Sequence, residues 1–300
     1  MLLRWLVTTW FQQSGREKMR DAVQSVLQDH LRPKPAAGRP AAPGAAAPDD
    51  AEPVPPLPCD VAFIFALNIE AGGLVDFLQD HVRTHCATFV EHGGLLGERR
   101  VILVETGVGR DAAARVTEDV IAVHKPAWVV SAGFAGALRS ELKRGHVLMA
   151  DVVADESGQS LAVGLKLDPQ TVAATPGLHV GRLLTVDRLI RDAAERGRLA
   201  EQHDALACDM ETAAVAETCR RLKTRFLSVR IISDTVDDVL PKEIENLLDQ
   251  SSLAGKIGAV TGAILNRPSS VKDIWQLREQ AIKASDRLAN FLTGVVSQLN

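Results

Sequence analysis

Three carboxylate side chains stand where predicted strands end, at places suited to chemistry on a bound small molecule: Glu70, Glu211 and Asp234. Glu70 comes just after the apolar run 61–67, where a carboxylate could act as a base on water. Glu211 could accept two hydrogen bonds from vicinal sugar hydroxyls, and a protonated Asp234 could give its proton to a leaving base. Ligands in open α/β sheets bind beyond the carboxyl ends of the strands, so these positions are the informative ones.

Each of these residues also has a purely structural explanation. Glu70 can interact with the dipole at a helix N-terminus. Asp209, Glu211 and Asp234 can each serve as a helix N-cap. Taken together, acidic residues at several strand ends, with glycine turns between them, favour a shared site. We therefore expect Glu70, Glu211 and Asp234 to meet around one cavity.

Two glycine turns follow further apolar strands, at 105–110 (ETGVGR) and 131–138 (SAGFAGAL). Glycine lets backbone amides approach a ligand closely, or simply permits a tight turn. The first turn lacks the third glycine of a dinucleotide-binding fingerprint. In the second, Gly133 and Gly136 bracket small residues against which a flat ring or a sugar could pack, with close helix–strand packing as the alternative.

The elements that must position these residues alternate between strands and helices from residue 60 onward. Continuous apolar runs such as 61–67 are typical of strands that are covered on both faces. The alternation predicts an α/β fold, a single three-layer domain with a central mixed, mostly parallel sheet flanked by helices. The predicted strands are 61–67, 100–106, 127–133, 146–154, 179–186 and 225–234, and the predicted helices are 70–82, 110–124, 188–201, 211–223, 241–265 and 271–298.

The first 58 residues differ in composition from the rest of the chain. Residues 33–58 hold nine of the 14 prolines and eight alanines, which predicts an extended linker. It separates a helical segment at 1–32 from a catalytic domain at 59–300. Within 1–11 the apolar side chains fall on one helical face, which favours packing on a partner, with weak membrane-surface contact as the alternative. This run is too short to span a bilayer.

Composition argues against several classes of partner. The formal charge of −4 carries no basic excess, so the electrostatic footprint of a nucleic-acid-binding protein is missing. The four cysteines match no zinc or redox spacing, and the eight histidines include no HExxH-like pair, so we expect neither a metal nor a cofactor. Free thiols are typical of a reducing compartment, which favours a cytoplasmic location, with peripheral membrane contact as the alternative.

Taken in order, these residues resemble the nucleoside phosphorylase/nucleosidase superfamily, and most closely its 5′-methylthioadenosine/S-adenosylhomocysteine nucleosidase branch. The resemblance covers roughly residues 60–265. Its Met-Glu and Ser-Asp elements are fairly specific, whereas the glycine turns are not. The runs that carry it are IFALNIEAG, VETGVGRDAAA, SAGFAGAL, LKRGHVLMAD, ACDMETAAVA and VRIISDTVDD.

The resemblance implies a role for each residue at a matching position. Glu70 would activate the attacking water, and Asp234 would protonate the purine at N7 with Ser233 helping to orient it. Glu211 would hold the ribose hydroxyls while Met210 packs on the sugar. The partners implied are a small-molecule nucleoside and a second copy of the chain in a homodimer. The remaining substrate-binding positions are Gly133, Phe134 and Ala135.

The choice between water and phosphate as the nucleophile depends on cationic side chains. Phosphate-using relatives place one arginine after the first strand and another in the central glycine signature. Here ALNIEAGG contains no arginine and Ser131 precedes the glycine turn, so a dianion has no charge-assisted clamp. We therefore expect a hydrolase that cleaves the N-glycosidic bond of a purine nucleoside of the methylthioadenosine/adenosylhomocysteine type.

Other functions remain open at this point. Phe134 stands where relatives often have a small residue, and the region 155–180 offers no aromatic side chain to stack on a purine. The alternatives are a phosphorylase, a nucleosidase for a futalosine-like or lipid-linked nucleoside, and a catalytically silent nucleoside-binding protein.

Overall fold

The computed structural model of the chain describes residues 58–164, 167–238 and 269–299. The predicted segments 1–32 and 241–265, and all but the last residue of the predicted linker, lie outside these ranges. The strands are β1 (Val61–Phe65), β2 (Gln79–His85), β3 (Val90–Leu96), β4 (Arg99–Glu105), β5 (Trp128–Ala137), β6 (Val147–Asp155), β7 (Ser160–Ala162), β8 (Leu178–Thr185), β9 (Ala207–Asp209) and β10 (Arg225–Asp234). The helices are α2 (Asn68–Val75), α3 (Arg110–His124), α4 (Pro169–Ala174), α5 (Ala193–His203), α6 (Thr212–Leu222) and α9 (Ser269–Val296).

The strands form one mixed sheet in which β1 lies between β4 and β5 and runs parallel to both. Strand β5 is also parallel to β10 and antiparallel to β9. Strands β10, β6, β8 and β9 are paired in that order, so together with β5 they close a ring of five strands. Strands β3 and β2 extend the other edge as an antiparallel hairpin.

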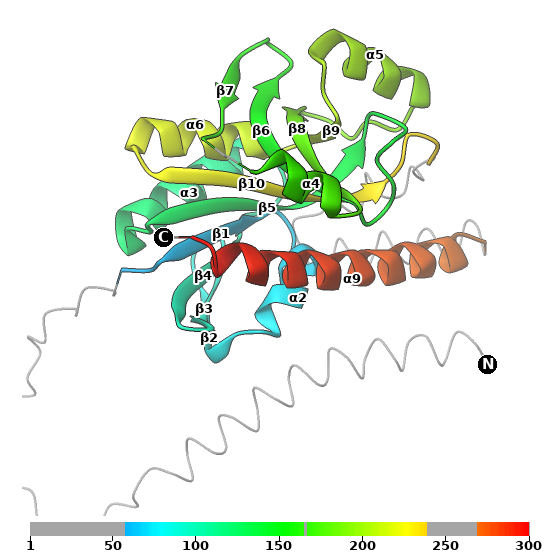
Figure 1. Ribbon diagram of the computed structural model, residues 1–300. Helices are drawn as coiled ribbons and strands as arrows, with labels where there is room; N and C mark the ends of the chain where they lie inside the picture. Colours follow the sequence, from blue (N-terminus) through cyan, green and yellow to red (C-terminus); the bar gives the residue numbers. More distant parts are fainter. Residues whose placement is uncertain (1–57, 165–166, 239–268, 300) are drawn as a thin grey trace, which may run out of the picture. The chain divides into compact units, whose positions relative to one another are not determined.

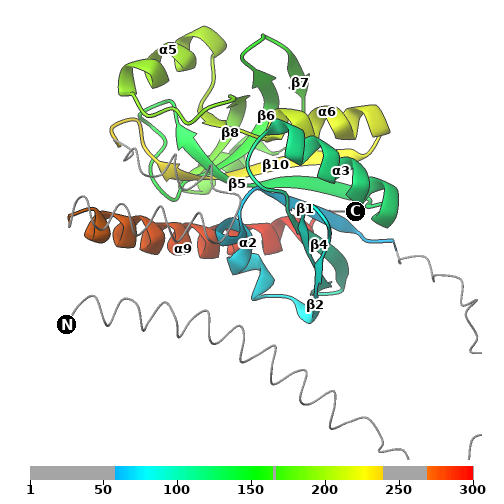
Figure 2. The same ribbon diagram turned by 180° about the vertical axis from the view of Figure 1, so that it is seen from behind.

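Helices cover both faces of the sheet, with α2 and α9 on one side and α3 and α6 on the other (Figures 1 and 2). Strand β1 is apolar throughout because its side chains alternate between two cores. Val61, Phe63 and Phe65 pack with residues of α2 and α9, while Ala62 and Ile64 pack with residues of α3 and α6. The predicted α/β sheet flanked by helices is confirmed.

The prediction was wrong around residues 70–85. The helix predicted at 70–82 ends at Val75, and residues 79–85 form β2, the outer strand of the hairpin. All seven side chains of β2 are exposed, so the strand carries none of the alternation that marks a half-buried strand. The helix predicted at 188–201 likewise begins later, at Ala193, where Asp192 caps it.

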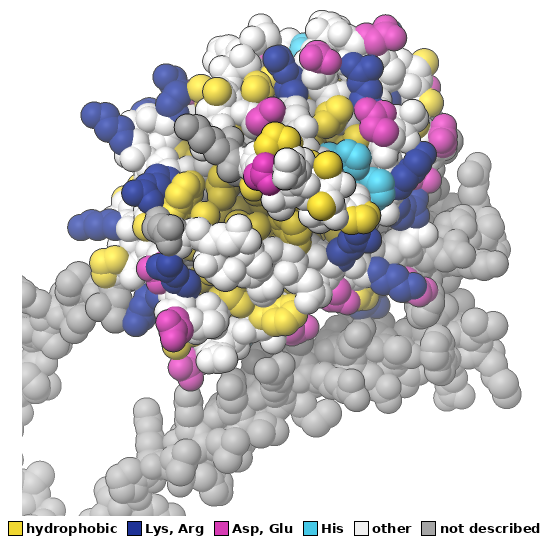
Figure 3. Space-filling view, viewed as in Figure 1, with side chains coloured by type: hydrophobic (Ala, Val, Ile, Leu, Met, Phe, Trp, Pro, Cys, Tyr) yellow, Lys and Arg dark blue, Asp and Glu magenta, His cyan; other side chains and the backbone are white. Residues whose placement is uncertain are grey.

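The surface of the described residues mixes charged and apolar side chains. On the face seen in Figure 3, basic and acidic side chains are interspersed around the rim, with apolar side chains between them. Within the described ranges no helix is long and apolar enough to cross a membrane. Residues 1–11, the predicted site of membrane-surface contact, lie outside those ranges. All four cysteines are free thiols.

Candidate active site

A pocket opens where several strands of the sheet end. Glu70, Glu211 and Asp234 all line it, although they come from distant parts of the chain. The other predicted site residues that line it are Met210, Ser233, Phe134 and Ala135. The structure therefore brings together the three carboxylates that the sequence singles out. Within the described ranges, no group of three or more His, Cys, Asp or Glu side chains could hold a metal ion.

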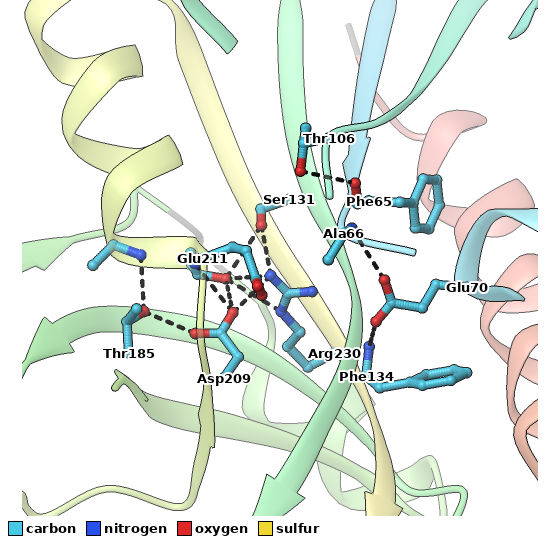
Figure 4. A network of polar contacts seen from close by, with 12 residues as sticks. Phe65, Ala66, Glu70, Thr106, Ser131, Phe134, Thr185, Asp209, Glu211 and Arg230 are labelled. Carbon is cyan, nitrogen blue, oxygen red and sulfur yellow. Dashed lines mark hydrogen bonds and ion pairs between the residues drawn. The ribbon is translucent and has the colours of Figure 1, made fainter. Parts of the chain in front are cut away.

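Glu70 lies in the first turn of α2 and is 5% exposed. Its Oε2 accepts a hydrogen bond from the backbone N–H of Ala66 (3.0 Å), and its Oε1 accepts one from Phe134 (2.7 Å) (Figure 4). Oε2 also accepts a hydrogen bond from the backbone N–H of Leu67 (2.8 Å). Burial raises the pKa of Glu70, while the charge of Arg230 and these three N–H donors oppose the rise. The carboxylate thus caps its helix and also faces the pocket.

Two close contacts fix the position of Glu70. Gly133 is not among the residues that line the pocket, and a Cβ atom there would come within 2.7 Å of Glu70 Oε1 and 2.5 Å of Arg230 Nη1. On the other side, the Ser285 hydroxyl of α9 donates to the backbone carbonyl of Glu70 (3.1 Å) and accepts from the Gly73 N–H (2.9 Å). Gly133 therefore permits the close approach of these side chains, and its predicted contact with a ligand stays a prediction.

Glu211 occupies the N-cap position of α6 and is 8% exposed. Its Oε1 accepts a hydrogen bond from the Gly109 N–H at 2.8 Å, so the glycine turn after β4 positions a carboxylate. Gly109 has φ 104°, a conformation that favours glycine. Burial, and next the charge of Asp209, raise the pKa of Glu211 to about 8, against the opposing effect of Arg230.

A buried ion pair that the sequence did not predict joins Arg230 to Asp209, which lines the pocket. Arg230, 2% exposed, contacts Asp209 Oδ2 through Nη2 at 2.7 Å and donates to the Ser131 hydroxyl at 2.7 Å. Asp209 also accepts hydrogen bonds from the hydroxyls of Thr185 and Thr212. Figure 4 shows the guanidinium between Asp209 and Glu70. The sequence did contain one indication of this pair, since Arg230 stands inside an apolar strand that is covered on both faces. A charged side chain in such a place requires an anionic partner.

Asp234 ends β10 and lines the pocket, with its side chain 13% exposed. Its Oδ1 accepts a hydrogen bond from the Ser233 hydroxyl at 2.6 Å, and its Oδ2 is ion-paired with Arg196 Nη2 at 2.5 Å. Gly136 makes room for this pair, since a Cβ atom there would lie 2.9 Å from Asp234 Oδ2. Arg196 also lines the pocket, so the ion pair keeps Asp234 at the site. No local sequence pattern pointed to Arg196.

The raised pKa of Glu211 predicts how stability depends on pH. Between its ordinary value of 4.5 and about 8, the folded chain binds a proton at Glu211 that the unfolded chain releases. The stability from this group is complete below about pH 4.5 and is lost as pH rises through about 8. In Glu211→Gln we expect the free energy of unfolding, measured by urea denaturation, to fall less steeply over this window.

The matched control for this experiment is Glu201→Gln, an exposed glutamate of α5. It should keep the pH dependence of the unmodified chain. Equal slopes for the unmodified chain and Glu211→Gln would show that Glu211 is ionised in the folded state throughout the window.

Curated relatives with similar sequences are named 5′-methylthioadenosine/S-adenosylhomocysteine nucleosidase. The protein from Staphylococcus epidermidis is 26% identical over 215 residues, which cover 65% of this chain and 94% of the relative. The one from Exiguobacterium sp. is 26% identical over 225 residues, covering 67% and 97%.

Solved structures show the same fold. A mutant of the Helicobacter pylori MTAN with 5′-methylthioadenosine in the active site superposes with a TM-score of 0.62 at 19% identity, covering 80% of this chain and 99% of that one. A futalosine hydrolase mutant of Helicobacter pylori gives a TM-score of 0.60 at 18% identity, covering 80% and 100%. The sequence profile of the phosphorylase superfamily matches residues 60–265, more than half of the chain. The chain belongs to the phosphorylase superfamily.

Proposed function

We propose that this chain hydrolyses the N-glycosidic bond of a purine nucleoside of the methylthioadenosine/adenosylhomocysteine type, releasing the free base and a ribosyl product. The observation that carries the proposal is that Glu70, Glu211 and Asp234 line one pocket. Two carboxyl groups in different protonation states on either side of one bond are the arrangement that glycoside hydrolysis requires. The names of the relatives in the phosphorylase superfamily support the choice of substrate.

In the proposed reaction, Asp234 carries a proton on Oδ1, the oxygen that Arg196 does not bind, and gives it to N7 of the purine. The C1′–N9 bond breaks with its electron pair passing to the base. Water adds to C1′ of the sugar, which has oxocarbenium character, and the water proton passes to Glu70. Burial raises the pKa of Glu70, which makes its carboxylate a stronger base than that of an exposed glutamate. Ser233 orients Asp234 through the 2.6 Å hydrogen bond to Oδ1.

Glu211 and Met210 would hold the sugar. Vicinal ribose hydroxyls donating to Glu211 would favour its ionised form, so nucleoside binding would release the proton that burial retains there. Met210 lines the pocket beside Glu211 and can pack on the ribose. Phe134 and Ala135 line the wall formed by β5, with the Phe134 N–H committed to Glu70.

The charges around the pocket support water over phosphate as the nucleophile. Both arginines that line it already bind carboxylates, Arg196 binding Asp234 and Arg188 binding Glu156 and Glu195. Arg230 is 2% exposed and bound to Asp209. A phosphate dianion would have to displace one of these pairs and would meet the carboxylate of Glu70, which repels it.

A base-release assay over several 5′-substituted adenosines, with and without phosphate, tests this proposal. We expect adenine release from methylthioadenosine or adenosylhomocysteine at the same rate in both buffers. Turnover that appears only with phosphate would identify a phosphorylase. Release from a futalosine-like or lipid-linked nucleoside alone would change the substrate class, and nucleoside binding without release would indicate a silent binding protein.

The assembly and location of the chain stay predictions. We propose a homodimer, which sedimentation of the purified chain would measure. A cytoplasmic location, and any membrane-surface contact through residues 1–11, are open to fractionation of cells that express the full chain.

A further inference from the structure

Arg196 of α5 lines the pocket and is buried, at 1% exposure. Its Nη2 contacts Asp234 Oδ2 at 2.5 Å and donates to the carbonyl of Ile190 at 2.9 Å. Its Nη1 donates to the carbonyls of Ala137 (3.1 Å) and Thr235 (3.2 Å). Three separate segments of backbone therefore fix the guanidinium, and their carbonyls would hold it in place without Asp234.

The position of Arg196 is unfavourable for a residue that serves only the fold. It stands within the first four residues of α5, where the helix dipole disfavours a cation. Its Nε–H is buried and meets no acceptor among the described residues. Replacing a buried ion pair by apolar side chains of similar volume is often neutral or stabilising, so packing alone gives no reason to retain this charge.

We propose that Arg196 is a positioning residue of the proposed reaction, which holds Asp234 against the leaving base and stabilises the carboxylate that remains after the proton has been transferred. The inference rests on the function proposed above. When the proton on Asp234 Oδ1 passes to N7 and the C1′–N9 bond breaks, a negative charge develops on a carboxyl group whose Oδ2 already lies 2.5 Å from the guanidinium, so no rearrangement is needed to stabilise it.

This role concerns the departure of the base, so it predicts a dependence on the leaving group. Adenine departs poorly as an anion and needs protonation, whereas 4-nitrophenolate departs as a stable anion. The two probes are 5′-methylthioadenosine and the 4-nitrophenyl β-ribofuranoside of 5-methylthioribose. A residue that served only the fold would affect the hydrolysis of both probes equally.

The test compares Arg196→Gln and Arg196→Lys with the unmodified chain on both probes. We expect Arg196→Gln to lower kcat for methylthioadenosine about 100-fold, the lower end of what general acid catalysis supplies, with KM changed less than about threefold. The rate on the nitrophenyl riboside should fall less than about threefold. Arg196→Lys keeps the charge and should recover part of the lost kcat.

The matched control is Arg198→Gln, an exposed arginine of the same helix, which should change neither rate. Equal losses on both probes, or no loss on either, would overturn the inference while leaving the proposed function standing. If Arg196→Gln does not fold, the rates of Arg196→Lys are measured on the two probes instead. A loss on methylthioadenosine that exceeds the loss on the nitrophenyl riboside supports the inference, and equal losses overturn it. An unmodified chain that releases no base from any nucleoside would overturn the proposed function, and this inference with it.

Discussion

Glu70→Gln is expected to lower kcat for base release by about 10³-fold, within the range that general base catalysis supplies. The amide cannot accept the proton of the attacking water. In Glu70 both carboxylate oxygens accept backbone N–H groups, Oε2 from Ala66 and Leu67 and Oε1 from Phe134. Glutamine replaces one of these oxygens by an NH2 group, which then faces an N–H donor. We expect that mismatch to cost about 1–3 kcal/mol of folding free energy. Adenine release and urea denaturation measure the two effects.

The control for this substitution is Glu98→Gln, which makes the same change at an exposed position. It should leave both kcat and the free energy of unfolding unchanged. Because Glu70 acts on water, its loss should slow methylthioadenosine and the nitrophenyl riboside alike. A Glu70→Gln variant with more than about a tenth of the original kcat would show that another group activates the nucleophile.

Asp234→Asn is the second substitution with a large expected effect. It removes the proposed proton donor, which predicts a loss of about 10² to 10⁴ in kcat for methylthioadenosine. It also leaves the guanidinium of Arg196, 1% exposed, facing a neutral amide. Removing one partner of a buried ion pair typically costs about 3–5 kcal/mol, and since asparagine still offers an acceptor we expect about 3 kcal/mol.

Kinetics and thermal denaturation of the same preparation separate these two effects. Asp237→Asn, an exposed aspartate three residues further along the chain, is the matched control and should alter neither. Asp234→Asn should also share the leaving-group dependence of Arg196→Gln, being slow on methylthioadenosine and close to normal on the nitrophenyl riboside. Full adenine release by a folded Asp234→Asn variant would remove Asp234 from the proposed mechanism.

The amino-acid sequence by itself determined the sheet and the meeting of two of the carboxylates. Strands such as 61–67 and 225–234 are largely apolar because helices cover both of their faces, and this local pattern is readable without the fold. Strands β1 and β10 both run parallel to β5 and end at the same edge of the sheet, so Glu70 and Asp234 at their ends come close together. Glu211 follows β9, which runs antiparallel to β5, so its place in the same pocket depends on that pairing in the tertiary structure.

The tertiary structure alone decided how those carboxylates are held. Arg230 and Arg196 bind Asp209 and Asp234, residues 21 and 38 positions away along the chain. These ion pairs form because the fold brings different strands and helices next to each other. The local pattern of apolar and polar residues does not show which of them will be neighbours. Strand β2 likewise could not be predicted from the sequence. It pairs with β3 through backbone hydrogen bonds, and because all its side chains are exposed, its sequence shows no alternation of apolar and polar residues.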